Sequence, residues 1–117
     1  MSTFLVATDF SEHADRALAH ACALAKLLSA RVELFSSAYI PPYLVAAVAT
    51  GMSPNWLQEA RDQASKQLDA LAVRLRTEGV PVTTSSSTEE PATAICARSD
   101  EIAADLVATG TRGRTGV

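Results

Sequence analysis

Cysteine is scarce in the sequence, and its scarcity limits the chemistry that we expect. Of 117 residues only Cys22 and Cys96 are cysteines, and both stand in alanine-rich segments with helical spacing. A thiol in such a setting usually behaves as a small buried hydrophobe. We therefore expect neither a disulfide nor a catalytic cysteine.

The sequence also has no excess of basic residues and no long apolar run. Lys and Arg number 10 against 13 Asp and Glu, which gives a net charge of −3. A nucleic-acid-binding surface would need an excess of basic residues to release counterions, so we do not expect a nucleic-acid partner. The opening segment "MSTFLVATDF" has no basic region before its short apolar run, unlike a signal peptide or a membrane anchor. We expect a cytoplasmic protein that does not bind a membrane.

Several catalytic motifs are missing as well. The sequence contains no "GxxxxGK" P-loop and no strand-linked "GxGxxG", and "DFSEH" lacks the second aspartate of phosphatases that use an aspartyl nucleophile. His13 and His20 are separated by about 10 Å along a helix, which is too far for them to share a metal ion. We expect no metal site and no enzymatic activity.

What the sequence does contain is an alternation of strand-like and helix-like segments. Residues 3–8, "TFLVAT", are short, apolar and β-branched, as in a buried strand. Ser11 is suited to cap a helix whose apolar residues repeat at intervals of three and four to about Ser29. Residues 31–37, "RVELFSS", form the next strand. A strand, a helix and a strand joined so closely require a parallel crossover.

The second half of the sequence continues this alternation after an irregular connection. Residues 39–53 contain two prolines and a glycine, and such a long connection either covers a site or is a plain flexible loop. The strand at 80–86 becomes polar toward its end, which is typical of a sheet edge. The further elements that we expect are a helix over 54–78, a helix from Pro91 and a strand over 105–110.

The resulting order, β-α-β-α-β-α-β, predicts one α/β domain spanning residues 1–117. Its sheet should be open and mostly parallel, with helices on both faces. In such sheets ligands bind outside the carboxyl ends of the strands, where the strand order reverses. We therefore expect binding residues at the carboxyl ends of the four expected strands.

A glycine-rich segment follows the last expected strand. Glycines spaced by three let backbone N–H groups converge on an anion, and arginine and threonine side chains can add contacts to a phosphate. The alternative is a turn that only leads the chain away from the sheet. The residues concerned are Gly110, Thr111, Arg112, Gly113, Arg114, Thr115 and Gly116.

Asp9 follows the first expected strand. Its carboxylate could accept hydrogen bonds from an adenine amine or a ribose hydroxyl, as acidic residues do in nucleotide-binding sheets. It could also cap the helix that follows it. The two interpretations are compatible.

Two segments, "FLVATDFSEHADRALAHACALA" at 4–25 and "ADLVATGTRGRTG" at 104–116, resemble the universal stress protein family. The resemblance implies a Rossmann-like fold of the adenine nucleotide alpha hydrolase type and an ATP site. Asp9 matches the aspartate that contacts adenine and ribose. Ser36 is matched by placement, to within one residue, to a position that contacts adenine through its backbone. The nucleotide-binding residues that we expect are Thr8, Asp9, Ser36, Gly110, Thr111, Arg112, Gly113 and Arg114.

The sequence departs from the family pattern at its end. Family members that bind ATP have Gly, two residues, Gly, nine residues and then Gly with Ser or Thr. Gly110 and Gly113 match the first half, whereas the second half would lie beyond Val117. A last helix and a fifth strand are missing in the same way. We therefore expect a domain that is incomplete at its carboxyl end, weak ATP binding, and an exposed fourth strand covered by another chain or a second copy.

The leading hypothesis is a non-enzymatic stress-response domain that binds an adenine nucleotide. The nucleotide would alter self-association or the choice of partner by binding two states differently. The alternative is an interaction module that uses its sheet edge and residues 39–53 without a nucleotide. An enzyme that holds a phosphorylated substrate in the glycine-rich segment is the least favoured hypothesis.

Overall fold

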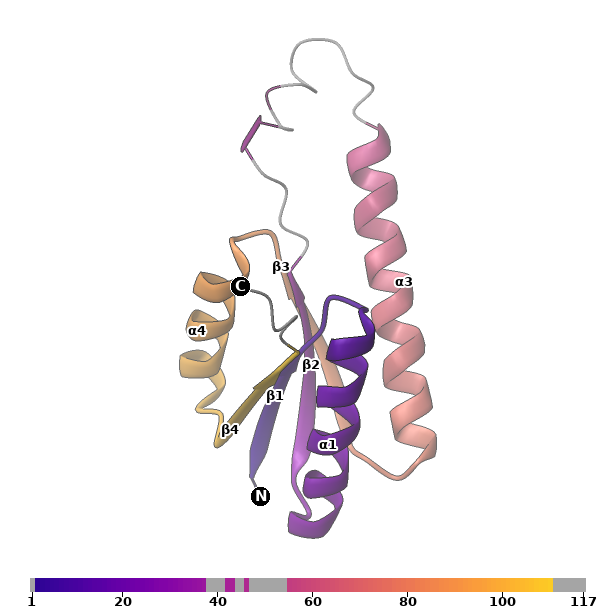
Figure 1. Ribbon diagram of the computed structural model, residues 1–117, viewed down its shortest axis with the longest axis vertical. Coiled ribbons are helices and arrows are strands. Elements are labelled where there is room, and N and C mark those ends of the chain that lie inside the picture. The colour runs from indigo at the N-terminus through magenta and orange to yellow at the C-terminus, as the bar shows by residue number, and fades with distance from the viewer. Residues whose placement is uncertain (1, 38–41, 44–45, 47–54, 111–117) are drawn as a thin grey trace.

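The computed structural model describes residues 2–37, 42, 43, 46 and 55–110. Four strands form one parallel sheet in the order β3-β2-β1-β4. Helices α1 and α3 pack on one face and α4 on the other (Figure 1). The predicted α/β fold is thus confirmed. The elements are β1 (Thr3–Ala7), α1 (Glu12–Leu28), β2 (Arg31–Ser37), α3 (Asn55–Thr77), β3 (Val82–Ser87), α4 (Pro91–Ile102) and β4 (Leu106–Thr109).

Strand β1 lies at the centre of the sheet and is buried along its whole length. It pairs with β2 on one side and β4 on the other, so that Phe4 lies beside both Val32 and Leu106. Strands covered on both faces read as continuous apolar runs, which explains the composition of β1. Its even-numbered apolar residues pack in one hydrophobic core and its odd-numbered apolar residues pack in another.

The larger core lies between the sheet, α1 and α3. Phe4 and Val6 of β1 contribute to it, with Leu18 of α1 and Leu68 of α3 among their neighbours. The smaller core lies under α4 and contains Leu5, Ala7, Phe35 and Ala94. The alternation of side chains along a strand produces this division.

The two cysteines lie in different environments. Cys22 belongs to the larger core, and burial raises the pKa of its thiol. Cys96 is exposed, so the expectation that both cysteines are buried was wrong for this residue. The face of α4 that meets the sheet carries Ala94 and Ile95, and Cys96 comes one position later, turned away from that face.

The helix starts predicted at Ser11 and Pro91 are found in the structure. The Ser11 hydroxyl accepts a hydrogen bond from the backbone N–H of Ala14 at 3.2 Å, as expected of an N-cap. Pro91 opens α4, and the Glu90 carboxylate caps it by accepting from the N–H groups of Ala92 and Thr93 at 3.1 Å each. No helix among residues 2–37 and 55–110 is long and apolar enough to cross a membrane.

An ion pair between buried Glu33 and partly exposed Arg98 joins the sheet to α4. Glu33 of β2 has only 8% of its surface exposed. Its carboxylate accepts two hydrogen bonds from the Arg98 guanidinium, one of them at 2.9 Å, and one from the Ser85 hydroxyl at 2.7 Å. These donors stabilise the charged form and lower the pKa of Glu33, with the Arg98 hydrogen bond as the largest cause.

The lowered pKa of Glu33 predicts a specific dependence of stability on pH. As the pH falls below about 4.3, the unfolded chain binds a proton at Glu33 before the folded chain does. The stabilisation is therefore fully present above that pH and is lost as the pH falls through the lower pKa of the folded state. At pH 7, Glu33→Gln should lower the free energy of unfolding by about 1–3 kcal/mol, since hydrogen bonds to a charged group are lost.

Urea unfolding at several pH values measures this difference. Glu101→Gln is a matched control, because Glu101 contacts the same Arg98 at 3.3 Å but its side chain is 64% exposed; its effect should stay within about 0.5 kcal/mol. If the difference in the free energy of unfolding between the wild type and Glu33→Gln stayed constant down to pH 3, the lowered pKa of Glu33 would be refuted.

Candidate functional site

A cavity opens at the carboxyl ends of β1, β2 and β4, on the side of the sheet that α4 covers. The strand order reverses beside β1, because β2 lies on one side of it and β4 on the other. The cavity measures about 370 Å³ and is lined by these strand ends and by the first turn of α4. We call it the carboxyl-edge cavity. Its polar lining residues are Thr8, Asp9, Ser37, Glu90 and Thr109.

The turn after β1 is held by its own side chains. The Thr8 hydroxyl accepts from the Phe10 N–H, and the Asp9 carboxylate accepts from the Ser11 N–H, both at 3.0 Å. The Thr8 N–H donates to the Phe35 carbonyl at 2.9 Å, which continues the ladder with β2. Asp9 thus supports the start of α1, in agreement with its interpretation as a helix cap. Its side chain is also exposed at the cavity.

Phe10 adopts a backbone conformation that is rare for a bulky residue. Its φ is +65°, in the left-handed region that costs about 1–3 kcal/mol outside glycine. The phenyl ring is half-buried and packs against the larger core. This packing offsets the strain and fixes the direction in which Asp9 leaves β1.

Gly110 is required by the close approach of two backbones. A Cβ added at this position would lie 2.5 Å from the N and Cα atoms of Ala14 and 2.6 Å from the carbonyl carbon of His13. The end of β4 therefore lies directly against the first turn of α1. Sequence analysis assigned Gly110 to an anion-binding loop, and the structure adds a steric reason for glycine that applies without any ligand.

The charge of the cavity comes from acidic groups. Asp9 and Glu90 are the charged residues among its described lining residues. Backbone N–H groups of Thr93 and Ala92 hold the pKa of Glu90 below its usual range. Carboxylates accept hydrogen bonds and repel anions, so the described part of the cavity suits a ligand group that donates hydrogen bonds.

The structure brings together Thr8, Asp9 and Gly110 of the eight expected nucleotide-binding residues. The Ser36 side chain lies on the opposite face of the sheet and lines a different hollow. The contact expected of Ser36 is through its backbone, and it stays a prediction; Phe35 and Ser37, on either side of it, line the cavity. The remaining expected residues, Thr111, Arg112, Gly113 and Arg114, lie outside the described residues.

Sequence analysis missed Ser37 and Glu90 as residues of this cavity. Ser37 follows Phe35 by two positions on β2, so both point toward α4, and the Ser37 hydroxyl donates to the Glu89 carbonyl at 2.6 Å. The register of Ala7 beside Phe35 would have identified Ser37, since Asp9 and Ser37 then share one face. Glu90 caps α4, and it reaches the cavity only because α4 packs on the sheet.

Metal binding has no support in the described part of the chain. Among residues 2–37, 42, 43, 46 and 55–110, no three His, Cys, Asp or Glu side chains lie close enough to hold an ion.

Comparisons with known proteins place the fold and the site in context. The sequence profile of the Universal stress protein family matches residues 1–117. A universal stress family protein from Burkholderia pseudomallei is 28% identical, with a TM-score of 0.75, and the match covers 94% of this chain and 81% of that one. Universal stress protein UspA from Lactobacillus plantarum is 20% identical, with a TM-score of 0.73 and coverages of 99% and 83%.

A third solved structure is a universal stress protein in complex with cAMP. It is 24% identical to this chain, with a TM-score of 0.57, and the match covers 91% of this chain and 69% of that one. A comparison with curated proteins gives no match.

The contact of Gly110 with α1 predicts the effect of a single methyl group. Gly110→Ala should lower the free energy of unfolding by about 1–3 kcal/mol, because a backbone cannot move aside as a flexible side chain does. Chemical denaturation measures the change. Thr109→Ala, at the exposed neighbouring position, should change the free energy of unfolding by no more than about 0.5 kcal/mol. Equal stability of Gly110→Ala and the wild type would rule out the close approach.

Proposed function

Because this chain belongs to the universal stress protein family, we propose that its carboxyl-edge cavity binds the adenosine part of an adenine nucleotide, with ATP as the leading candidate. One observation carries the proposal. Asp9 and Gly110 lie together at the point where the strand order reverses, in a cavity of about 370 Å³. Ligands of open α/β sheets bind at such points.

The chemistry of the cavity matches adenosine better than it matches a phosphate group. Adenosine offers an amine and two ribose hydroxyls as hydrogen-bond donors, and the described lining supplies carboxylates on Asp9 and Glu90. Ala7, Phe35 and Ile95 provide apolar surface for a base. The cavity volume falls within the range of about 300–1,000 Å³ that is usual for small-molecule sites.

The phosphates would extend toward the segment that follows Gly110. Arg112 and Arg114 supply positive charge there, and Thr111 and Gly113 supply hydroxyl and backbone donors. The related protein with bound cAMP supports an adenine nucleotide as the ligand class.

We assign the nucleotide a regulatory role and no chemical step. Catalysis of hydrolysis would need a base that orients a water molecule. The Glu90 carboxylate accepts from two N–H groups, which lower its pKa. A carboxylate with a lowered pKa is a poor general base.

Asp9→Asn tests the nucleotide proposal without removing the turn. Asparagine retains the oxygen that accepts from the Ser11 N–H, but it replaces the second acceptor with an NH₂ donor. ATP affinity, measured by isothermal titration calorimetry, should fall at least about tenfold, which corresponds to about 1.4 kcal/mol. The free energy of unfolding should change little.

Asp15→Asn is the matched control, since Asp15 is an exposed carboxylate in the first turn of α1 that does not line the cavity. Its ATP affinity should equal that of the wild type. Absence of ATP binding by the wild type, or equal affinities for Asp9→Asn and the wild type, would end the nucleotide proposal.

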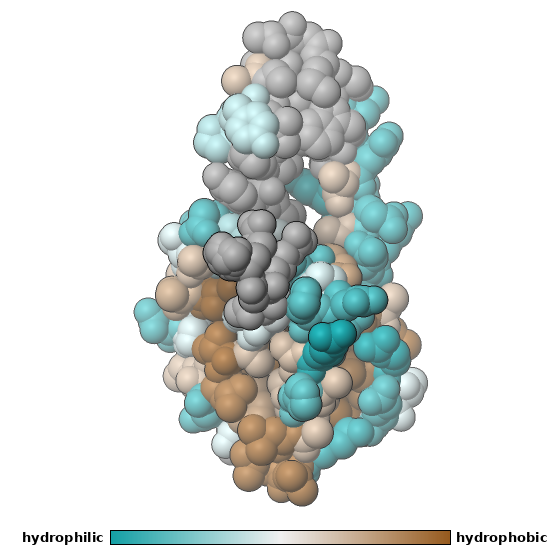
Figure 2. Space-filling view, viewed as in Figure 1, coloured by the Kyte–Doolittle hydropathy of each residue, from teal (hydrophilic) through white to brown (hydrophobic). Residues whose placement is uncertain are grey.

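The same proposal includes self-association in the cytoplasm through the edge of β4. Among the strands that the structure describes, β4 pairs with β1 alone, and Val107 on it is 43% exposed. Hydrophobic surface gathers on the face that carries β4 and continues toward the lower end of the molecule (Figure 2). An unpaired strand edge is a template for pairing with another chain, and a second copy offers the same edge.

A charge on β4 should prevent this association. Val107→Lys should raise the dissociation constant of the assembly at least about tenfold, because edge lysines oppose strand pairing. Size-exclusion chromatography with light scattering measures the mass. Val73→Lys makes the same change on α3, where the valine is 57% exposed, and should leave the mass unchanged. A wild-type protein that stays monomeric at high concentration would contradict the proposal.

A further inference from the structure

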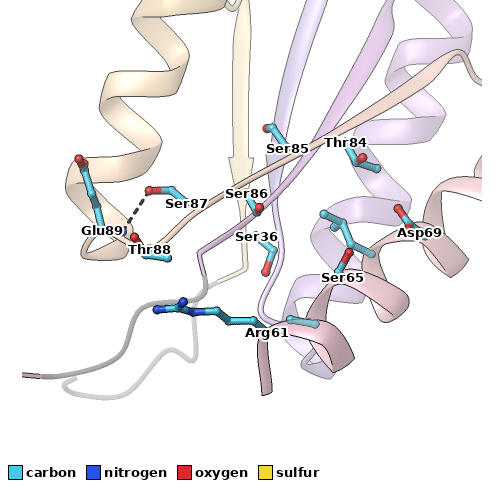
Figure 3. Close-up of a pocket in the computed structure, with 12 residues that line it drawn as sticks. Ser36, Arg61, Ser65, Asp69, Thr84, Ser85, Ser86, Ser87, Thr88 and Glu89 are labelled. Carbon is cyan, nitrogen blue, oxygen red and sulfur yellow. Dashed lines mark hydrogen bonds between the residues drawn. The ribbon is translucent and has the colours of Figure 1, made fainter. Parts of the chain in front are cut away.

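A second hollow lies on the other face of the sheet, between the carboxyl half of β3 and α3. It measures about 550 Å³. We call it the hydroxyl groove and define it by Ser36 of β2, Thr84 and Ser86 of β3, and Ser65 and Asp69 of α3. Figure 3 shows these side chains around one space, with those of α3 facing the strands and Arg61 extending beside them.

The groove exists because the core between α3 and the sheet stops short of the strand ends. Leu34 and Val82 are buried on this face, and Leu68, Ala72 and Leu75 of α3 cover them. One step further along each strand the apolar residues give way to hydroxyl-bearing ones. On α3 the turn before Leu68 carries small residues, Ala64 and Ser65. Small side chains on both walls leave the space open.

Ser36 is the residue whose surroundings indicate that the groove binds a ligand. It is only 5% exposed, and its hydroxyl has no hydrogen-bond partner among the residues that the structure describes. Ser86 lies directly beside it in the parallel register. A buried hydroxyl without a partner is destabilising, and such groups in native proteins commonly reflect a missing ligand or an ordered water.

The chemistry of the groove selects a neutral, polyhydroxylated ligand. Serine and threonine hydroxyls both donate and accept, so they complement a molecule whose own groups do the same. Thr84 and Ser86 repeat along one face of β3 at about 6.6–6.8 Å, the two-residue period of a strand. The charged residues among the described lining residues are Arg61, Asp69 and Glu89, whose charges sum to −1 and disfavour an anion.

We propose that the hydroxyl groove is a binding site for a sugar or cyclic polyol, separate from the carboxyl-edge cavity. The Asp69 carboxylate accepts from adjacent hydroxyls of the ligand, Arg61 donates to a ring or hydroxyl oxygen, and Ser36 contacts the most deeply buried hydroxyl. The two sites share no described lining residue. The groove can therefore be filled whether or not a nucleotide binds.

Titration of the isotopically labelled chain with D-ribose, D-glucose and myo-inositol, followed by NMR, tests this site. At least one of the three should cause saturable shifts of the amides of Ser36, Ser65 and Ser86, with the amides of Asp9 and Gly110 unmoved. Ser36→Ala and Asp69→Asn should each weaken that binding about tenfold or more. Asp100→Asn, on α4 outside the groove, should leave it unchanged.

The thermal midpoint of Ser36→Ala separates a ligand-binding role from a structural one. Because the hydroxyl has no partner in the described part of the protein, its removal should leave the midpoint unchanged or raise it. A clear fall in the midpoint would mean that the hydroxyl is satisfied within the fold and would overturn the proposal. So would the absence of saturable shifts in the groove with all three probes, whatever the outcome with ATP.

Discussion

The parallel pairing of β1 with both β2 and β4 is the interaction on which the rest of the structure depends. It buries all five residues of β1 and gives the two faces of the sheet their separate cores. It also places the carboxyl ends of three strands at one edge, so that the turn after β1 and the end of β4 become neighbours. The carboxyl-edge cavity follows from this topology before any side-chain chemistry is considered.

Side-chain alternation then divides the polar residues between two hollows. Ser36 and Ser37 are consecutive, yet one lines the groove under α3 and the other lines the cavity under α4. A change of one position in a strand moves a side chain across the sheet. The two sites consequently differ in chemistry: one supplies carboxylate acceptors and apolar surface, and the other supplies mainly hydroxyls.

Local features of the sequence were sufficient to predict the order of the elements and the starts of two helices. Ser11 and Pro91 act within a single turn of helix, so their roles depend little on the rest of the fold. The Glu33–Arg98 pair could not be predicted in this way, because its partners are 65 positions apart and meet only once α4 packs on the sheet. The contact of Gly110 with Ala14 is likewise a tertiary contact, which local sequence patterns do not reveal.

The candidate site was predicted only in part, because some of its residues can be located from local features of the sequence and others only from tertiary contacts. Asp9 and Gly110 adjoin strand ends that the apolar pattern already located, and their convergence follows from a parallel sheet. Ser37 could not be chosen in this way, because a placement that is uncertain by one residue cannot tell which face a side chain occupies. Cys96 shows the same difficulty on a helix, where one position decides between the core and solvent.

The central claim is that the carboxyl edge of the sheet, and not the groove under α3, receives the adenine nucleotide. Mapping the backbone amide shifts of the labelled chain during titration with ATP tests it most directly. The account predicts saturable shifts at Thr8, Asp9 and Gly110, with the amides of Thr84 and Ser86 unchanged. Saturable shifts confined to the groove, or none at the strand ends of β1 and β4, would contradict it.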